Sequence, residues 1–240
     1  MSERVRVLIP YFPGVNCHRE TMYAFRSVGA EPRLGLLSAL MDGTCRLDDC
    51  DILALAGGFA FGDDHAAGRV MAIDLTRRFG DQLRRVVEKH IPVIGICNGF
   101  QAQMETGLLP GDGEIGQPTA VLDHNVTARF EHWRFTPVVL HDPVDVGCVW
   151  TKGLDGAKIR LPSAHGQGFP VLPNGPDSYH VMATYGAYEG DSTYIGVGGS
   201  SPNGSKIAGL CTKYCAGLMP HPERSEDGLV IFEAGVNSVR

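Results

Sequence analysis

The segment Pro92-Val93-Ile94-Gly95-Ile96-Cys97-Asn98-Gly99 joins a strand to a helix through a tight turn. Pro92–Ile96 is a short apolar run, typical of a buried strand, and residues 98–107 have the pattern of a short helix. Gly95 and Gly99 stand two residues before and after Cys97, where they let the backbones of the strand and the helix approach. This spacing of small residues around a nucleophile is the sequence form of a nucleophile elbow.

The segments around this elbow alternate between strand and helix. Apolar runs predict strands at 4–11 and 51–56, a helix that Asn16 could cap is expected to end near Gly29, and residues 72–87 have the apolar spacing of an amphipathic helix. Further short β-like runs occupy 135–140, 158–161, 181–185 and 206–210. Such alternation predicts an α/β fold with a mostly parallel central sheet covered by helices on both faces. No linker, charge block or repeat divides the chain, so we expect a single domain over residues 1–240.

Composition excludes several classes of protein. The 240 residues carry 21 Lys+Arg against 27 Asp+Glu, a formal charge of −6, whereas a nucleic-acid surface would be basic. The chain contains neither an export signal nor an apolar run of the roughly 20 residues that span a bilayer. Seven irregularly spaced cysteines indicate reduced thiols rather than a disulfide framework. These features predict a cytoplasmic protein.

Cys97 is the candidate nucleophile. At a helix N-terminus the macrodipole favours its thiolate, and the backbone N–H of Asn98 could donate to an oxyanion. Read without the rest of the chain, the same segment also fits a buried, unreactive cysteine at the end of a strand.

A thiolate that attacks an amide needs a histidine as base and acid, and an orienting group for that histidine. His221 has Glu223 two residues on, on one side of what we expect to be an extended segment around Pro222. His165 has only Gln167 at the same spacing. Because a carboxylate stabilises an imidazolium better than a neutral amide does, His221 is the preferred base.

Taken together, these residues resemble the class I, or triad-type, glutamine amidotransferases. The motifs that carry the resemblance are Gly95–Gln101, Ala56–Asp63 and Pro220–Arg224, joined by Pro13–Cys17, Arg129–Glu131, Ala164–Gly168 and Pro202–Ser205. They occur in the family's order over nearly the whole chain. Within the class they are most similar to the glutaminase subunits and domains of phosphoribosylformylglycinamidine synthases.

The resemblance implies a flavodoxin-like fold and a Cys97–His221–Glu223 triad. It also implies an oxyanion hole from the backbone amides of Gly58 and Asn98, and a contact between Gln101 and the substrate glutamine. The implied reaction releases glutamate and ammonia through a thioester on Cys97. The ammonia would serve the conversion of formylglycinamide ribonucleotide to formylglycinamidine ribonucleotide in purine biosynthesis.

The second half of that reaction has no candidate site in this chain. No G-x-x-x-x-G-K-[ST] phosphate loop is present, and the glycine-rich stretch Gly196–Lys206 has the wrong order and is expected to form a connecting turn. The resemblance therefore implies no cofactor here, with ATP and Mg²⁺ on a larger synthetase partner and a small third subunit left open. Because this chain has its own Met1 and only a short tail after the triad motif, we expect it to be a free-standing subunit.

Other interpretations stay open at this stage. Gln167 stands where the family usually has Glu, and the loops at 62–69 and 129–139 diverge, so the same glutaminase chemistry could serve another synthetase. A peptidase, deglycase or chaperone with a cysteine elbow, and a subunit that only scaffolds its partner, are further alternatives. Cys211, Cys215 and His221 could suggest a zinc site, but their spacing is poor, and we expect no metal.

Overall fold

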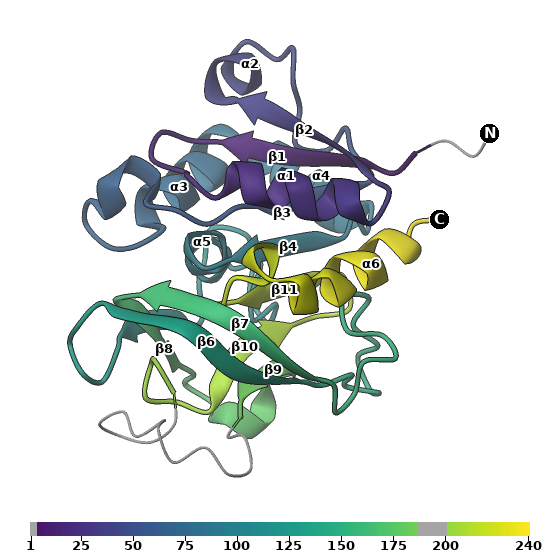
Figure 1. Ribbon diagram of the computed structural model, residues 1–240. Coiled ribbons are helices and arrows are strands. Elements are labelled where there is room, and N and C mark those ends of the chain that lie inside the picture. Colours follow the sequence, from purple (N-terminus) through teal and green to yellow (C-terminus); the bar gives the residue numbers. More distant parts are fainter. Residues whose placement is uncertain (1–3, 187–200) are drawn as a thin grey trace.

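The computed structural model describes residues 4–186 and 201–240, so Gly196–Lys206 begins outside the described ranges. Its main element is a nine-stranded sheet with the order β2-β1-β3-β4-β11-β10-β9-β6-β7, beside a small sheet of β5 and β8 (Figure 1). The strands are β1 (Arg6–Tyr11), β2 (Glu31–Leu36), β3 (Ile52–Leu55), β4 (Val93–Ile96), β5 (Val121–His124), β6 (Glu131–Leu140), β7 (Lys158–His165), β8 (Gln167–Val171), β9 (Val181–Tyr185), β10 (Ile207–Cys211) and β11 (Cys215–Leu218).

Most strands of the large sheet run in one direction. All neighbouring pairs from β2 to β11 are parallel. The strands β10 and β6 run the opposite way, which leaves β9 and β7 in the direction of β11. The predicted α/β fold with a mostly parallel sheet is therefore confirmed. The carboxyl ends of β1, β3, β4 and β11 meet at one edge, where open α/β sheets bind ligands.

Helices cover both faces of the parallel strands. Helices α1 (His18–Ser27) and α6 (Leu229–Asn237) lie together on one face, while α4 (Gly80–Glu88) and α5 (Asn98–Thr106) lie behind the sheet (Figure 1). Helix α3 (Arg69–Ile73) packs on α5, and the short α2 (Leu37–Met41) follows β2. Every residue of β3 and β4 is buried, as expected for central strands between two layers of helices.

The expected helix over 72–87 is interrupted. A π-helical turn, η2 (Asp74–Arg78), separates α3 from α4, which begins at Gly80. The hydroxyl of Thr76 donates to the carbonyl of Ala72 at 2.8 Å, a bond that competes with the regular helix ladder. The apolar spacing shows which side of this region is buried, but it does not reveal the break.

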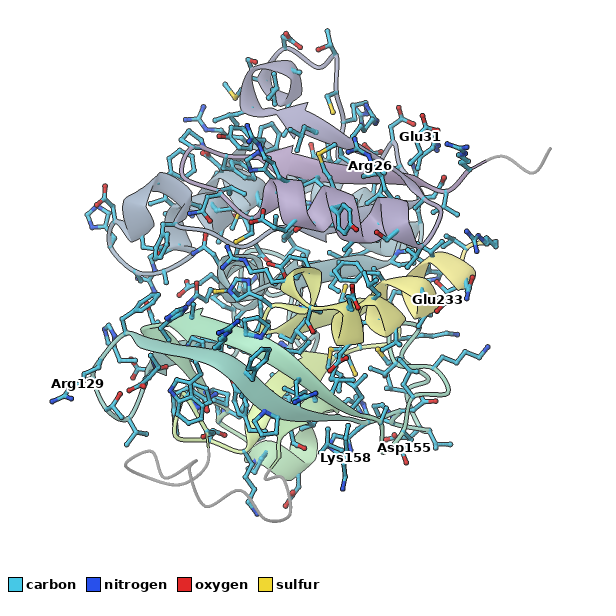
Figure 2. The ribbon with its side chains drawn as sticks, in the orientation of Figure 1. Arg26, Glu31, Arg129, Asp155, Lys158 and Glu233 are labelled. Atoms are coloured by element: carbon cyan, nitrogen blue, oxygen red, sulfur yellow. The ribbon has the colours of Figure 1, made fainter. Side chains whose placement is uncertain are left out.

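Charged side chains gather at the periphery. Figure 2 labels Arg129 on the loop before β6 and Glu233 on α6, both at the outer edge of the ribbon. Among the helices of residues 4–186 and 201–240, none combines the length and apolar composition required to cross a bilayer.

Candidate active site

Cys97 occupies a strained turn directly after β4. Its φ and ψ are 51° and −107°, outside the regions that non-glycine residues favour, as at a nucleophile elbow. A Cβ on Gly99 would overlap the carbonyl oxygen of Leu55, and one on Gly95 would overlap the side chain of Gln103. Both flanking positions therefore need glycine, as the sequence pattern indicates.

Sheet pairing brings His221 to Cys97. Strands β4 and β11 are parallel neighbours, and the N–H of Cys97 donates to the carbonyl of Leu218 at 2.8 Å, three residues before His221. The N–H of His221 is held at 2.8 Å by the carbonyl of Pro162 in β7. The Sγ of Cys97 donates to the carbonyl oxygen of Ala164 at 3.6 Å, and a negative charge on Cys97 acts on the His221 imidazole. Two residues 124 positions apart in the chain thus meet at one sheet edge.

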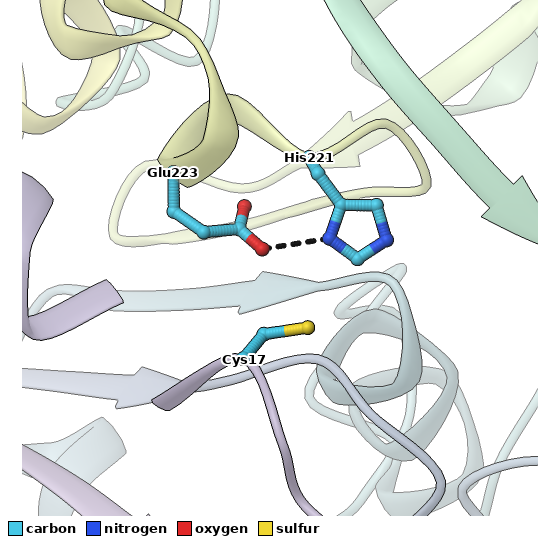
Figure 3. A group of neighbouring side chains, drawn as sticks. All are labelled: Cys17, His221 and Glu223. Atoms are coloured by element: carbon cyan, nitrogen blue, oxygen red, sulfur yellow. Dashed lines mark hydrogen bonds and ion pairs between the residues drawn. The ribbon is translucent and has the colours of Figure 1, made fainter. Parts of the chain in front are cut away.

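Glu223 orients the imidazole. Nδ1 of His221 and Oε1 of Glu223 lie 2.6 Å apart, and the pair is buried (Figure 3). The segment is not extended as expected, because Pro222–Arg224 forms a 3₁₀ turn, η4, in which proline takes the first position. The pairing exists, but the strand-like alternation that we expected to produce it is wrong.

His221 is poised to hold a proton. Burial disfavours its imidazolium, but the negative charges of Glu223 and of a Cys97 thiolate outweigh burial. Together they raise the pKa of His221 well above its usual value of 6.5. A protonated His221 next to Cys97 can supply a proton to a leaving group at neutral pH.

His165 lies near His221 but has a different environment. Its Nδ1 is 3.0 Å from Oδ1 of Asn125, whose Nδ2 donates to the carbonyls of His165 and Arg129. Burial and the charge of His221 lower the pKa of His165 to about 3. The alternative pair of His165 with Gln167 does not form, since the Gln167 side chain bonds to Ala67 and Leu122. A histidine that stays neutral at pH 7 is a poor acid for this reaction.

A cavity of about 430 Å³ opens onto Cys97, a size suited to a small ligand. Its walls include the following residues: Gly58, Phe59, Asp63, Gln101, Phe130 and His165. Gly58 has a φ of 145°, and a Cβ there would come within 2.6 Å of the backbone nitrogen of Asn16. Of the predicted substrate-binding residues, Gly58 and Gln101 therefore line the same cavity as Cys97.

Asn98 is the first residue of α5, and its side chain bonds to residues in and next to the cavity wall. Its Oδ1 accepts from the N–H of Ala60 at 3.0 Å, while its Nδ2 donates to Asp63 at 2.7 Å and to Oε1 of Gln101 at 3.0 Å. Its backbone N–H is at the first turn of the helix, where amides have no partner within the helix. The side chain of Asn98 is thus structural, which leaves the backbone N–H for a ligand.

The sequence model described as CobB/CobQ-like glutamine amidotransferase domain matches residues 4–232. The chain belongs to this family. The resemblance drawn from the sequence motifs is confirmed.

Named relatives of this amidotransferase are phosphoribosylformylglycinamidine synthase subunits PurQ. The one from Dehalococcoides mccartyi is 37% identical over 227 residues, which cover 92% of this chain and 86% of the relative. The one from Pyrococcus furiosus is 32% identical over 250 residues, covering 98% of this chain and 99% of the relative.

Two solved structures are similar over more than nine-tenths of this amidotransferase. The structure of PurLQS from Thermotoga maritima contains a chain that matches with a TM-score of 0.78 at 28% identity, covering 99% of this chain and 100% of that one. A glutamine amidotransferase from Thermotoga maritima matches with a TM-score of 0.55 at 17% identity, which shows a shared fold.

Gln167 has a defined structural role in this amidotransferase. Its Oε1 accepts from the N–H of Ala67 at 3.0 Å, and its Nε2 donates to the carbonyl of Leu122 at 3.0 Å. Its own carbonyl accepts from Nε2 of Gln101 at 2.6 Å. A carboxylate could not donate to Leu122, so the amide suits this position and connects β5 with the loop that walls the cavity.

Cys17, His221 and Glu223 place a sulfur, a nitrogen and an oxygen within 4.8 Å of one another (Figure 3), a ligand set that zinc could use. However, Arg224 donates to the sulfur of Cys17 at 3.0 Å, and its Nε lies 4.0 Å from Oε1 of Glu223. The guanidinium occupies the sulfur and repels a divalent cation. We therefore assign no metal to this group.

Sequence reasoning did not assign roles to Cys17, Asp63, Phe130 or Arg224. Each lies in or next to a motif that carried the resemblance, but only the fold brings them to the site. Burial raises the pKa of Asp63 above its usual value, although hydrogen bonds from Asn98 and Gly68 oppose the shift.

Proposed function

We propose that this chain hydrolyses glutamine to glutamate and ammonia and delivers the ammonia to an ATP-dependent synthetase. That synthetase converts formylglycinamide ribonucleotide to formylglycinamidine ribonucleotide in purine biosynthesis. The placement of Cys97 near His221, which is paired with buried Glu223, beside a small-molecule cavity carries the proposal. The PurQ names of the relatives support the choice of pathway.

Acylation begins with attack of the Cys97 thiolate on the side-chain amide carbon of glutamine. The carbonyl oxygen becomes an oxyanion, for which the backbone amides of Gly58 and Asn98 are the proposed donors. His221, which holds a proton beside the sulfur, gives that proton to the amide nitrogen, and ammonia leaves. The product on the enzyme is a γ-glutamyl thioester of Cys97.

Deacylation uses the same residues in reverse. His221 is neutral after it has given up its proton, so it can remove one from a water molecule as that water attacks the thioester. The oxyanion again develops beside Gly58 and Asn98. Glu223 stabilises the imidazolium that forms, and collapse of the intermediate releases glutamate and restores the Cys97–His221 pair.

Ammonia must leave without meeting bulk water, where it would be protonated and lose its nucleophilicity. We infer that the cavity mouth faces the larger synthetase, which holds ATP and Mg²⁺, with a small third subunit where the assembly includes one. The PurLQS assembly of the Thermotoga maritima relative supports such a partner. The seven free cysteines agree with our placement of this chemistry in the cytoplasm.

Purification of the native complex through this chain tests the proposal. The isolated chain and the complex are each assayed for glutamate release, and the complex for glutamine-dependent amidation of formylglycinamide ribonucleotide. We expect amidation with glutamine or ammonium as nitrogen donor. Glutamate release coupled to another acceptor would assign a different synthetase, while no glutamate release from chain or complex would reject the glutaminase.

A further inference from the structure

Arg224 lies beside the catalytic pair, and the reaction steps above give it no task. Its Nε is 4.0 Å from Oε1 of Glu223, its Nη2 donates to Sγ of Cys17 at 3.0 Å, and the same Nη2 lies 3.9 Å from Oε1 of Glu20. The guanidinium is therefore held between α1 and η4, next to the carboxylate that orients His221.

Glu223 is poorly supplied with partners for a buried anion. Its side chain has no exposed surface, Oε1 is bonded to His221, and Oε2 is buried without a hydrogen-bond partner among the described residues. A buried carboxylate remains charged only if positive charge lies nearby. Within the described part of the chain, His221 and Arg224 are the two cationic side chains within 4.0 Å of it.

One of these two cations is transient. Before acylation, a protonated His221 neutralises Glu223. When the proton leaves with ammonia, His221 becomes neutral, and Arg224 is the positive charge that stays. During this interval water hydrolyses the thioester, and His221 must act as the base.

The contacts that fix Arg224 leave the hydrogen bond between His221 and Glu223 intact. The thiol of Cys17 donates to Oδ1 of Asn16 at 3.3 Å and accepts from Arg224, so both its roles are filled within the chain. The 4.0 Å separation of Arg224 from Glu223 exceeds hydrogen-bond length, so the guanidinium leaves Oε1 to His221.

Other charged groups near η4 do not replace Arg224. The elements packed against η4 are α1, β7, η5 (Glu226–Gly228) and α6. Their titratable side chains are His18, Arg19, Glu20, Tyr23 and Arg26 in α1, Lys158, Arg160 and His165 in β7, Glu226 and Asp227 in η5, and Glu233 in α6. Glu20, Glu226 and Asp227 add negative charge, and the guanidinium carbon of Arg160 lies 6.0 Å from the ring of Phe135.

We propose that Arg224 is a positioning residue that balances the buried charge of Glu223 while His221 is neutral, and that it thereby supports hydrolysis of the thioester. The inference rests on the proposed glutaminase reaction. Without Arg224, the buried charge of Glu223 would have no cation beside it during that interval, so His221 would hold its proton more tightly and act less readily as the base.

The test compares Arg224→Gln, which removes the charge, with Arg224→Lys, which retains it. Arg84→Gln removes an exposed arginine paired with Asp81 and serves as the control. Glutamate release is measured against pH, and rapid quenching gives the fraction of enzyme held as thioester. For Arg224→Gln we expect kcat to fall roughly tenfold, the acid limb to move to higher pH and the thioester to accumulate. Arg224→Lys should keep the wild-type acid limb and most of kcat.

If Arg224 has a purely structural role, its variants should give different results. If Arg224→Gln lowers kcat equally at every pH with no extra thioester, or leaves kcat unchanged, the proposal is wrong. Should Arg224→Gln fail to fold by circular dichroism, Arg224→Lys decides alone. A wild-type pH profile and kcat in the lysine variant support the proposal, and a kcat reduced equally at all pH values contradicts it. Failure of the wild-type enzyme to release glutamate would instead reject the proposed function.

Discussion

Nδ1 of His221 lies 2.6 Å from Oε1 of Glu223, and both side chains are withdrawn from water. This contact fixes which imidazole nitrogen faces the carboxylate and leaves the other for chemistry. It also opposes the effect of burial, which by itself would make His221 a weak base. The contact gives the first prediction.

Glu223→Gln should lower glutaminase turnover by roughly 10²-fold, because a neutral amide stabilises the imidazolium less well. Since Glu223 raises the pKa of His221, the alkaline limb of kcat against pH should move to lower pH in the variant. Steady-state assays at several pH values measure both effects. Cys97 should remain open to alkylation by iodoacetamide, which shows that the site is intact. Unchanged turnover would remove Glu223 from the triad.

Cys97→Ala should abolish glutamine-dependent amidation in the complex while ammonium-dependent amidation continues. Only the source of ammonia is lost, because the synthetase site lies on the partner. Product formation with each nitrogen donor is the measurement. Loss of the ammonium-dependent reaction as well would contradict this division of labour.

Gln167→Glu should destabilise the chain by about 1–3 kcal/mol at neutral pH. The carboxylate cannot donate to the carbonyl of Leu122, and that oxygen would face a negative charge. Urea unfolding measures the loss, which should shrink at pH values low enough to protonate the new carboxyl group. A variant as stable as the wild type at pH 7 would show that the link between β5 and the cavity wall is unimportant.

His165 should make the fold sensitive to acid. Its folded-state pKa of about 3 lies below the unfolded value of 6.5, so the unfolded chain binds the extra proton first as pH falls. The contribution of His165 to stability is thus complete above pH 6.5 and is lost below it, by about 2 kcal/mol at pH 5.

Urea unfolding at pH 7.5 and 5 measures this difference. His165→Phe should flatten the loss of stability between the two pH values, whereas His132→Phe, at an exposed position, should not. An equal loss in wild type and His165→Phe would show that another group titrates. The comparison uses the slope with pH, since His165→Phe also leaves Asn125 without its partner.

Much of this fold can be predicted from the sequence where the chain is buried on both sides. The apolar runs of β1, β3 and β4 and the glycine spacing around Cys97 are local signals, and the structure places these elements as expected. Strands β2 and β11 cannot be predicted from the sequence, because Pro32, Gly35 and Gly217 weaken their β pattern. These strands form through pairing with their neighbours in the sheet.

Side-chain partners are harder to predict than strands. Asn16 is a good capping residue, yet Cys17 takes the N-cap position and Asn16 accepts a bond from its thiol instead. Gln167 is adjacent to Gly166, and the turn sends its amide to Ala67 and Leu122 instead of His165. Arg224 donates to the sulfur of Cys17, which lies 207 positions away in the sequence. No local pattern encodes this contact.

The nucleophile can be identified directly by trapping the thioester. The enzyme is mixed with glutamine, quenched in acid within milliseconds, digested and analysed by mass spectrometry. We expect a γ-glutamyl group on the peptide that contains Cys97, and none on the peptide that contains Cys17, although the Cys17 sulfur also lies within 4.8 Å of a ring nitrogen of His221. Glutamate release with the acyl group on Cys17, or with no modified cysteine at any quench time, would contradict the assignment of Cys97.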